Sequence, residues 1–65
     1  MQIQLNGESR EIEAPTLALL VAELGLETRT IAIEYNLEVA PKSGWGQCQI
    51  HTGDRIEVVQ MIGGG

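Results

Sequence analysis

The last three residues, Gly63, Gly64 and Gly65, are the part of this sequence best suited to chemistry. They follow residues 55–62, a β-branched run that is typical of a strand. Glycine has the greatest conformational freedom of any residue, so the run suggests a flexible tail thin enough to enter a narrow channel. An α-carboxyl group has an ordinary pKa of about 3.3–3.7, so Gly65 would carry an unhindered carboxylate at neutral pH. The alternative is that chain ends commonly fray.

Cys48 and His51 are the other candidates, as a thiolate–imidazole pair. Because residues three apart in a strand point to opposite faces, we expect a buried structural Cys48 and a solvated His51. One cysteine and one histidine do not supply the three or four ligands of a metal site, and no glycine-rich phosphate-binding motif is present. We therefore expect a chain that is acted upon by other proteins rather than an enzyme, with no cofactor and no metal bound by this chain.

Size and charge limit the classes of protein to consider. Sixty-five residues make one domain, near the lower limit for folding without disulfides or metal, and Cys48 alone cannot form an internal disulfide. The net charge of −5 argues against nucleic acid and suits docking on an electropositive protein surface, although acidity also keeps small proteins soluble. With neither a signal peptide nor an apolar run of about 20 residues, we expect a cytoplasmic protein that does not bind membranes.

The elements that must position the tail begin with a hairpin. Residues 1–5 alternate between apolar and polar side chains, and Asn6-Gly7 is the strongest short signal for a two-residue turn. A second strand is expected over about Ser9 to Ala14. The turn sets the register and places four apolar side chains on one face: Met1, Ile3, Leu5 and Ile12.

A short helix is predicted over Leu17 to Leu24. Its apolar residues fall at helical spacing: Leu17, Leu20, Val21 and Leu24. Thr16 is the expected N-cap, and Gly25 suits the left-handed position that ends helices. A helix of this length is not stable alone in water, so it must pack on the sheet.

The second half returns to strands. We expect one over Thr30 to Tyr35, a turn at Asn36-Leu37, a very short strand over 38–40, and an irregular segment over 42–46. Trp45 in that segment could anchor a partner, but in so small a chain it is expected to plug one end of the core with its N–H near water. We expect residues 47–51 to pair weakly, with Cys48 and Ile50 inward, before a turn over 52–54.

The final strand places Ile56 and Val58 inward and leaves Glu57, Val59 and Met61 outward. Val59 and Met61 would form an apolar patch beside the tail. Exposed patches of this kind mark interfaces, although single exposed apolar residues are common. We interpret Glu57, Val59 and Met61 as a surface for docking a partner.

Taken together, these elements resemble the ubiquitin-like β-grasp fold, an α+β fold with a mixed four- to five-stranded sheet packed on one short helix. More narrowly, the sequence resembles the ThiS family of thiamin-pathway sulfur carriers, within the MoaD/ThiS superfamily, in Asn36, Pro41, Trp45, residues 53–59 and Ile62-Gly63-Gly64-Gly65. The resemblance implies a domain over 1–62 and a tail over 63–65. Leu37 departs from the Asn-Gly that the family often has there, and a leucine at positive φ would be strained, so we expect a different turn geometry.

The resemblance also implies a mechanism. A ThiF-like adenylyltransferase, which uses the ATP and the metal, would adenylate the Gly65 carboxylate. A persulfide from a donor such as a cysteine desulfurase would convert Gly65 to a thiocarboxylate, and a ThiG-like thiazole synthase would take the sulfur. Gly63 and Gly64 would thread the channels of these partners.

Three alternatives stay open at this stage. The Gly-Gly ending is shared with MoaD-like carriers for molybdopterin or another product, although these are usually longer. It is also shared with ubiquitin-like protein modifiers, which would form isopeptide bonds through Gly65. In the third, Cys48 would act as a small thiol carrier or redox site.

Overall fold

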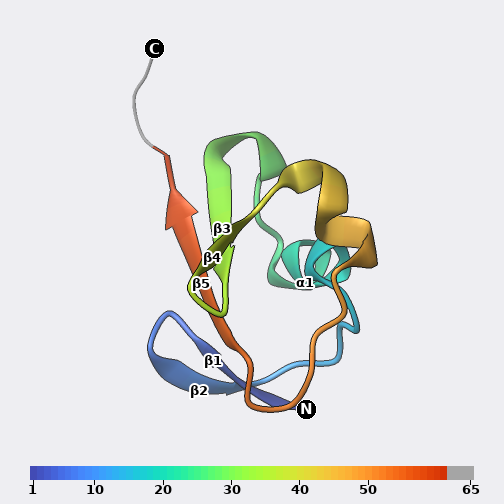
Figure 1. Ribbon diagram of the computed structural model, residues 1–65, viewed down its shortest axis with the longest axis vertical. Helices are drawn as coiled ribbons and strands as arrows, with labels where there is room; N and C mark the ends of the chain where they lie inside the picture. The colour runs from blue at the N-terminus through green and yellow to red at the C-terminus, as the bar shows by residue number, and fades with distance from the viewer. Residues whose placement is uncertain (62–65) are drawn as a thin grey trace.

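The computed structural model describes residues 1–61, so the predicted tail, Gly63 to Gly65, lies outside the described residues. Five strands form one sheet in the order β2-β1-β5-β3-β4, with helix α1 on one side of it (Figure 1). The helical segments are α1 (Leu17–Leu24) and two 3-10 helices, η1 (Thr28–Thr30) and η2 (Lys42–Gln47). The strands are β1 (Gln2–Leu5), β2 (Glu8–Glu11), β3 (Ile31–Tyr35), β4 (Glu38–Ala40) and β5 (Arg55–Gln60). This arrangement confirms the predicted α+β fold of β-grasp type.

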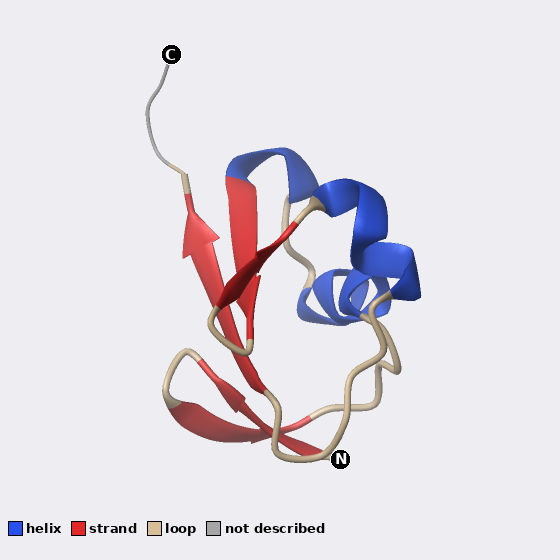
Figure 2. Ribbon diagram, in the orientation of Figure 1, coloured by secondary structure: helices blue, strands red, loops and turns tan. Residues whose placement is uncertain are grey.

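The last strand, β5, lies in the centre of the sheet. On one side it runs parallel to β1, in the register Gln4↔Arg55 and Leu5↔Ile56. On the other side it runs antiparallel to β3, from Tyr35↔Ile56 to Ile31↔Gln60. The start of β5, at Arg55 and Ile56, is therefore held between two neighbours, whereas the rest of the strand pairs only with β3 (Figure 2).

The predicted first hairpin is confirmed in its register, since β1 and β2 pair at Leu5↔Glu8 and Ile3↔Arg10. The expected second strand is too long, because β2 ends at Glu11. Beyond it, the carboxylate of Glu23 on α1 accepts hydrogen bonds from the backbone N–H groups of Glu13 and Ala14, at 2.8–3.2 Å. A side chain of the helix thus takes the place of a strand partner.

The predicted helix is confirmed at both ends. The Thr16 hydroxyl accepts a hydrogen bond from the Leu19 N–H at 3.3 Å, and Gly25 has a left-handed backbone with φ of 70°. Leu17, Leu20 and Val21 are buried against the sheet. Within the described part of the chain, no helix has the length and apolar character needed to cross a membrane.

The core lies between the sheet and α1, where apolar side chains from every part of the described chain meet. Its buried members are Ile3, Leu5, Ile12, Ala14, Leu17, Leu20, Val21, Ile31, Ile33, Trp45, Ile50 and Ile56. Trp45 is 5 % exposed, which confirms its role in the core. The indole N–H, which was expected to lie near water, instead donates a hydrogen bond to the Ala40 carbonyl at 2.8 Å.

One segment of the second half differs from prediction, and the segment after it agrees in its weak pairing. Residues 42–47, expected to be irregular, form η2, which packs beside α1 and carries Trp45 into the core (Figure 2). Residues 47–51 pair weakly, as expected: they form no strand, and one isolated bridge joins Gln49 to Thr16. Ile50 is buried, as predicted, whereas Cys48, which was expected to be buried, is half-buried. The alternation of apolar residues thus predicted which side chains point inward, but it did not predict the 3-10 helix that precedes them.

The expectation of a different turn at Asn36-Leu37 is wrong. Asn36 and Leu37 have φ of 50° and 76°, close to the values of 51° and 82° at Asn6 and Gly7. Both hairpins therefore have the two positive φ angles that a type I′ turn requires. A leucine in this region is strained by roughly 1–2 kcal/mol, because its Cβ crowds the backbone. The pairing of β3 and β4 holds it there.

We predict that Leu37→Gly raises the free energy of unfolding by about 0.5–1 kcal/mol, because relief of the strain exceeds the extra entropy of glycine in the unfolded chain. The Leu37 side chain is 70 % exposed, so few contacts are lost. Urea denaturation followed by tryptophan fluorescence measures the change. Gly7→Leu is the matched reverse substitution at the first hairpin and should lower stability by about 1 kcal/mol. A Leu37→Gly protein less stable than the parent would contradict this account.

Candidate functional site

Strand β5 and the residue that follows it direct three side chains to the face of the sheet opposite α1. Glu57 is half-buried, whereas Val59 and Met61 are 51 % and 55 % exposed. The outward orientation predicted for these residues is confirmed, and their predicted docking role stays a prediction. We call this side of the sheet the outer face.

The register of the sheet adds residues that the sequence analysis missed. Glu34 on β3 lies opposite Glu57, and Val39 on β4 lies opposite Glu34. Residues directly opposite in a sheet share a face, so Val39, which is 70 % exposed, extends the apolar surface toward β4. The sequence alone does not show that Val39 lies on this face, because a three-residue strand is too short to reveal which of its side chains alternate outward. The pairing of Val39 with Glu34 is needed to place it.

Carboxylates lie among the apolar side chains of the outer face. Glu34 and Glu57 are direct cross-strand neighbours, and like charges in that relation destabilise a sheet. The Nη2 atom of Arg55 lies 3.7 Å from a carboxylate oxygen of Glu57 and offsets part of this charge. The combination of apolar groups and excess carboxylate suits a partner surface that presents apolar and basic groups.

Two asparagine side chains hold β5 in place. The Asn6 side-chain oxygen accepts the Val58 N–H at 2.8 Å, and the Asn36 side-chain oxygen accepts the Arg55 N–H, also at 2.8 Å. Each asparagine begins a turn with a positive φ. Where the backbone of each hairpin turns away from β5, the asparagine side chain therefore replaces the backbone as the hydrogen-bond acceptor for β5.

Asp54, just before β5, is the centre of a polar network. Its carboxylate accepts hydrogen bonds from the Tyr35 hydroxyl, from the His51 backbone N–H at 2.7 Å and from the Asn36 amide at 3.4 Å. Burial raises the pKa of Asp54, but these hydrogen bonds outweigh it and leave the pKa below its ordinary value. The bond to Asp54, helped by burial, raises the pKa of Tyr35 to about 12.

The structure does not join Cys48 and His51 into a reactive pair. Burial raises the pKa of the Cys48 thiol, with a smaller contribution from Asp54, which makes the thiol a poor nucleophile at neutral pH. The His51 side chain is 72 % exposed and its Nδ1 atom lies 3.8 Å from Asp54. Among residues 1–61, no three histidine, cysteine or carboxylate side chains are grouped so that they could hold a metal ion.

We predict that the Tyr35–Asp54 bond stabilises the fold from about pH 4 to pH 10, the ordinary pKa values of the two groups in an unfolded chain. Above pH 10 the unfolded chain loses the tyrosine proton while the folded protein keeps it, so stability falls as the pH rises toward about 12. Below pH 4 the unfolded chain gains the Asp54 proton first, so stability falls again as the pH drops through the folded pKa.

Tyr35→Phe tests this prediction, because it removes the hydroxyl and keeps the ring. We expect a loss of about 1.5–3 kcal/mol at pH 7, the usual contribution of a hydrogen bond to a charged group. The decline between pH 10 and 12 should become shallower. Urea denaturation across the pH range measures both effects, and an unchanged alkaline decline in the variant would contradict the assignment to Tyr35.

Comparison with known proteins extends to the whole chain, including the glycines outside the described residues. Residues 3–65 match the family model described as the ThiS family. The chain is 33 % identical to the sulfur carrier protein ThiS of Thermus thermophilus, over 97 % of this chain and 98 % of that protein. It is 44 % identical over its full length to a thiazole synthase of Paramagnetospirillum magneticum.

The chain spans only about a fifth of the length of the thiazole synthases that it matches, since it covers 20 % of each. A solved structure of a thiamine biosynthesis protein (ThiS) from Geobacter metallireducens superimposes with a TM-score of 0.87, covering 100 % of both chains at 23 % identity. At that level of identity the likeness supports the fold. The sequence matches, over nearly all of the chain, support the family.

Proposed function

This chain belongs to the ThiS family of thiamin-pathway sulfur carriers, and we propose that its Gly65 carboxylate is the group that carries the sulfur. The observation that carries the proposal is the match of residues 3–65, which runs through the final glycines. The two thiazole synthases add support for the acceptor, because each contains a region similar to this whole chain within a much longer protein.

The chemistry requires activation of the carboxylate. A carboxylate resists nucleophiles, so an adenylyltransferase of ThiF type would let a Gly65 oxygen attack the α-phosphate of ATP, releasing pyrophosphate and forming an acyl adenylate. The terminal sulfur of a persulfide then attacks the acyl carbon and expels AMP, giving an acyl disulfide. A thiol reductant supplies two electrons to cleave the S–S bond, which leaves a thiocarboxylate on Gly65. ATP and metal bind to the enzyme, and a thiazole synthase of ThiG type receives the sulfur.

We propose that the activating enzyme docks on the outer face, through Glu57, Val59 and Met61. Val59 and Met61 are exposed, and the half-buried Glu57 side chain lies on the same face of the sheet. The backbone N–H of Met61 donates to the carbonyl of Thr30, the last residue of η1 before β3, at 2.6 Å. A hydrogen-bonded surface therefore extends to Met61, four residues before Gly65.

We predict that incubation with the activating enzyme, ATP and a persulfide donor exchanges one oxygen of Gly65 for sulfur. Intact-mass spectrometry and analysis of the C-terminal peptide measure the exchange. Deletion of Gly65 should abolish it and leave the thermal unfolding curve unchanged, because the buried core lies between Ile3 and Ile56. Cys48→Ala is the control and should keep full transfer. An unchanged C-terminal peptide in the parent protein, or transfer that depends on Cys48, would refute the proposal.

We also predict that Val59→Asp weakens binding of the activating enzyme by about tenfold or more, because it places a charge in an apolar contact. Leu19→Asp on α1 is a matched control, since Leu19 is 52 % exposed and Val59 is 51 % exposed. Isothermal titration calorimetry compares the two variants, with circular dichroism to confirm folding. Equal affinities for the two variants would remove the outer face from the docking surface.

A further inference from the structure

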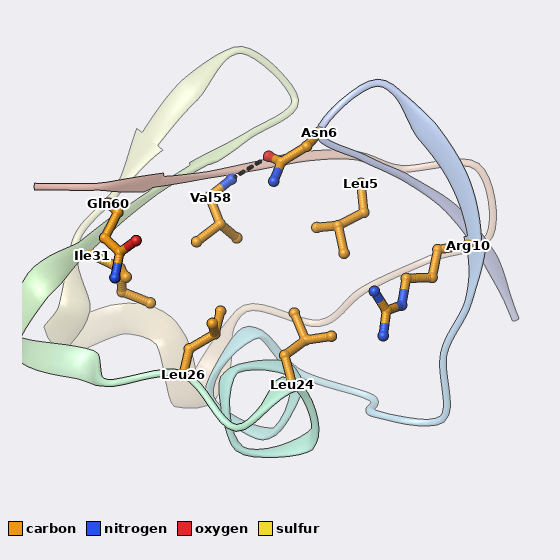
Figure 3. Close-up of a pocket in the computed structure, with 8 residues that line it drawn as sticks. All are labelled: Leu5, Asn6, Arg10, Leu24, Leu26, Ile31, Val58 and Gln60. Carbon is orange, nitrogen blue, oxygen red and sulfur yellow. Dashed lines mark hydrogen bonds between the residues drawn. The ribbon is translucent and has the colours of Figure 1, made fainter.

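A groove opens on the helix side of the sheet, between the β1–β2 hairpin, the C-terminal end of α1 and the second half of β5 (Figure 3). Its volume is about 320 Å³. The apolar lining is Leu5, Leu24, Leu26, Ile31 and Val58, and the polar lining is Asn6, Arg10 and Gln60. The groove exists because α1 has only eight residues and ends at Gly25, so this end of the sheet is not covered by helix.

Arg10 is an unusual residue for this face. Its cross-strand partner Ile3 is 1 % exposed on the helix side, and opposite residues share a face, so Arg10 projects toward the helix as well. Figure 3 shows its guanidinium group reaching along the groove toward Leu24. None of the ion pairs within residues 1–61 includes Arg10. A cation therefore stands at an apolar groove in a chain of net charge −5.

The backbone of β5 is open along the same groove. Pairing with β1 stops at Leu5↔Ile56, and the next N–H on that side, from Val58, is bound by the Asn6 side chain. Because N–H groups alternate in direction along a strand, that of Gln60 points to the same side as that of Val58. Within the described residues no strand pairs with Gln60 there. An open strand edge beside an apolar groove is suited to receiving an added strand.

We propose that this groove binds an extended, acidic and apolar segment of the thiazole synthase. The segment pairs with β5 at Gln60, inserts an apolar side chain between Leu5 and Leu24, and places a carboxylate against Arg10. The identity of the partner rests on the proposed sulfur-carrier function and on the thiazole synthases that contain a region similar to this chain. The carrier then has two docking surfaces on opposite sides of one sheet, one for each enzyme.

A peptide fits these features better than a small molecule does. A small acid would use Arg10 and the apolar lining but would leave the edge of β5 open. An extended segment satisfies the backbone, the apolar lining and the cation together, because alternate side chains of a strand point to one side. Its carboxylate also complements the one charged group of the lining.

The first experiment is titration of the ¹⁵N-labelled chain with unlabelled thiazole synthase, without ATP or sulfur donor. We expect shifts or broadening at the amides of residues 5–10, 24–26 and 58–60. Arg10→Glu should weaken the affinity by about tenfold. Arg29→Glu is the matched control, since it changes the charge equally at a side chain that is 86 % exposed and does not line the groove. It should change the affinity by less than about twofold.

Gln60→Pro tests the backbone pairing separately. Proline removes an N–H that points away from β3, so the β3–β5 pairing is kept, and proline is tolerated at such edge positions. We expect the affinity to fall about tenfold while the Tyr35 and Ile33 amide signals stay in place. Loss of those signals would signify unfolding, and Arg10→Glu then decides the question.

Three results would overturn the inference. The first is unchanged affinity in Arg10→Glu. The second is a response of the groove amides to the adenylyltransferase alone. The third is a response to increasing concentration of the chain itself, which would identify a second copy as the occupant. Because binding is measured on the unmodified chain, these results are distinct from failure to form a thiocarboxylate, which bears on the proposed function.

Discussion

Backbone hydrogen bonding on both sides of β5 is the interaction on which the rest of the structure depends. The strand is the last in the sequence but the middle one in the sheet, parallel to β1 and antiparallel to β3. The first and third strands can join into one sheet only through it, so the fold is completed by its final element. Such pairing between distant parts of a chain is slow to form, but it ties the end of the domain to its centre. Met61 leaves the sheet as an extension of a central strand.

The two hairpins hold β5 by the same means. Each begins its turn with an asparagine at positive φ, and each asparagine side chain accepts an N–H of β5. A backbone that turns away would otherwise leave those exposed N–H groups to bond water, whereas an intramolecular hydrogen bond contributes about 0.5–1.5 kcal/mol. The side chain of an asparagine is short enough to bond beside its own backbone and tolerates the left-handed region. This explains why both turns begin with the same residue although the second residue differs.

Much of the fold could be predicted from the sequence, because local rules decide it. Alternation, the Asn6-Gly7 turn and the Thr16 and Gly25 caps each act over a few residues. Three features depend instead on distant contacts: the end of β2 on Glu23, the 3-10 helix around Trp45 and the positive φ of Leu37. For the candidate site, the alternation of β5 was enough to predict its outward residues. The faces of Val39 and Arg10 follow only from the pairing of their strands with β3 and β1. The hairpin register predicted from Asn6-Gly7 already pairs Glu8 and Arg10 with the inward residues Leu5 and Ile3. Two charged residues on the inward face of a strand indicate that this part of the face is open.

In the two proposals, the alternation of β5 gives one strand two separate uses. Glu57, Val59 and Met61 face outward, near the carboxylate of Glu34. Val58 and Gln60 line the groove on the other face, where the charged side chain is that of Arg10. A carrier loaded by one enzyme and unloaded by another must leave the first before the second can take the glycine end. If both enzymes used one surface, the second could bind only after the first had dissociated completely. The two proposed surfaces, on opposite sides of the sheet, would permit the second enzyme to bind earlier, while Gly65 would still enter only one active site at a time.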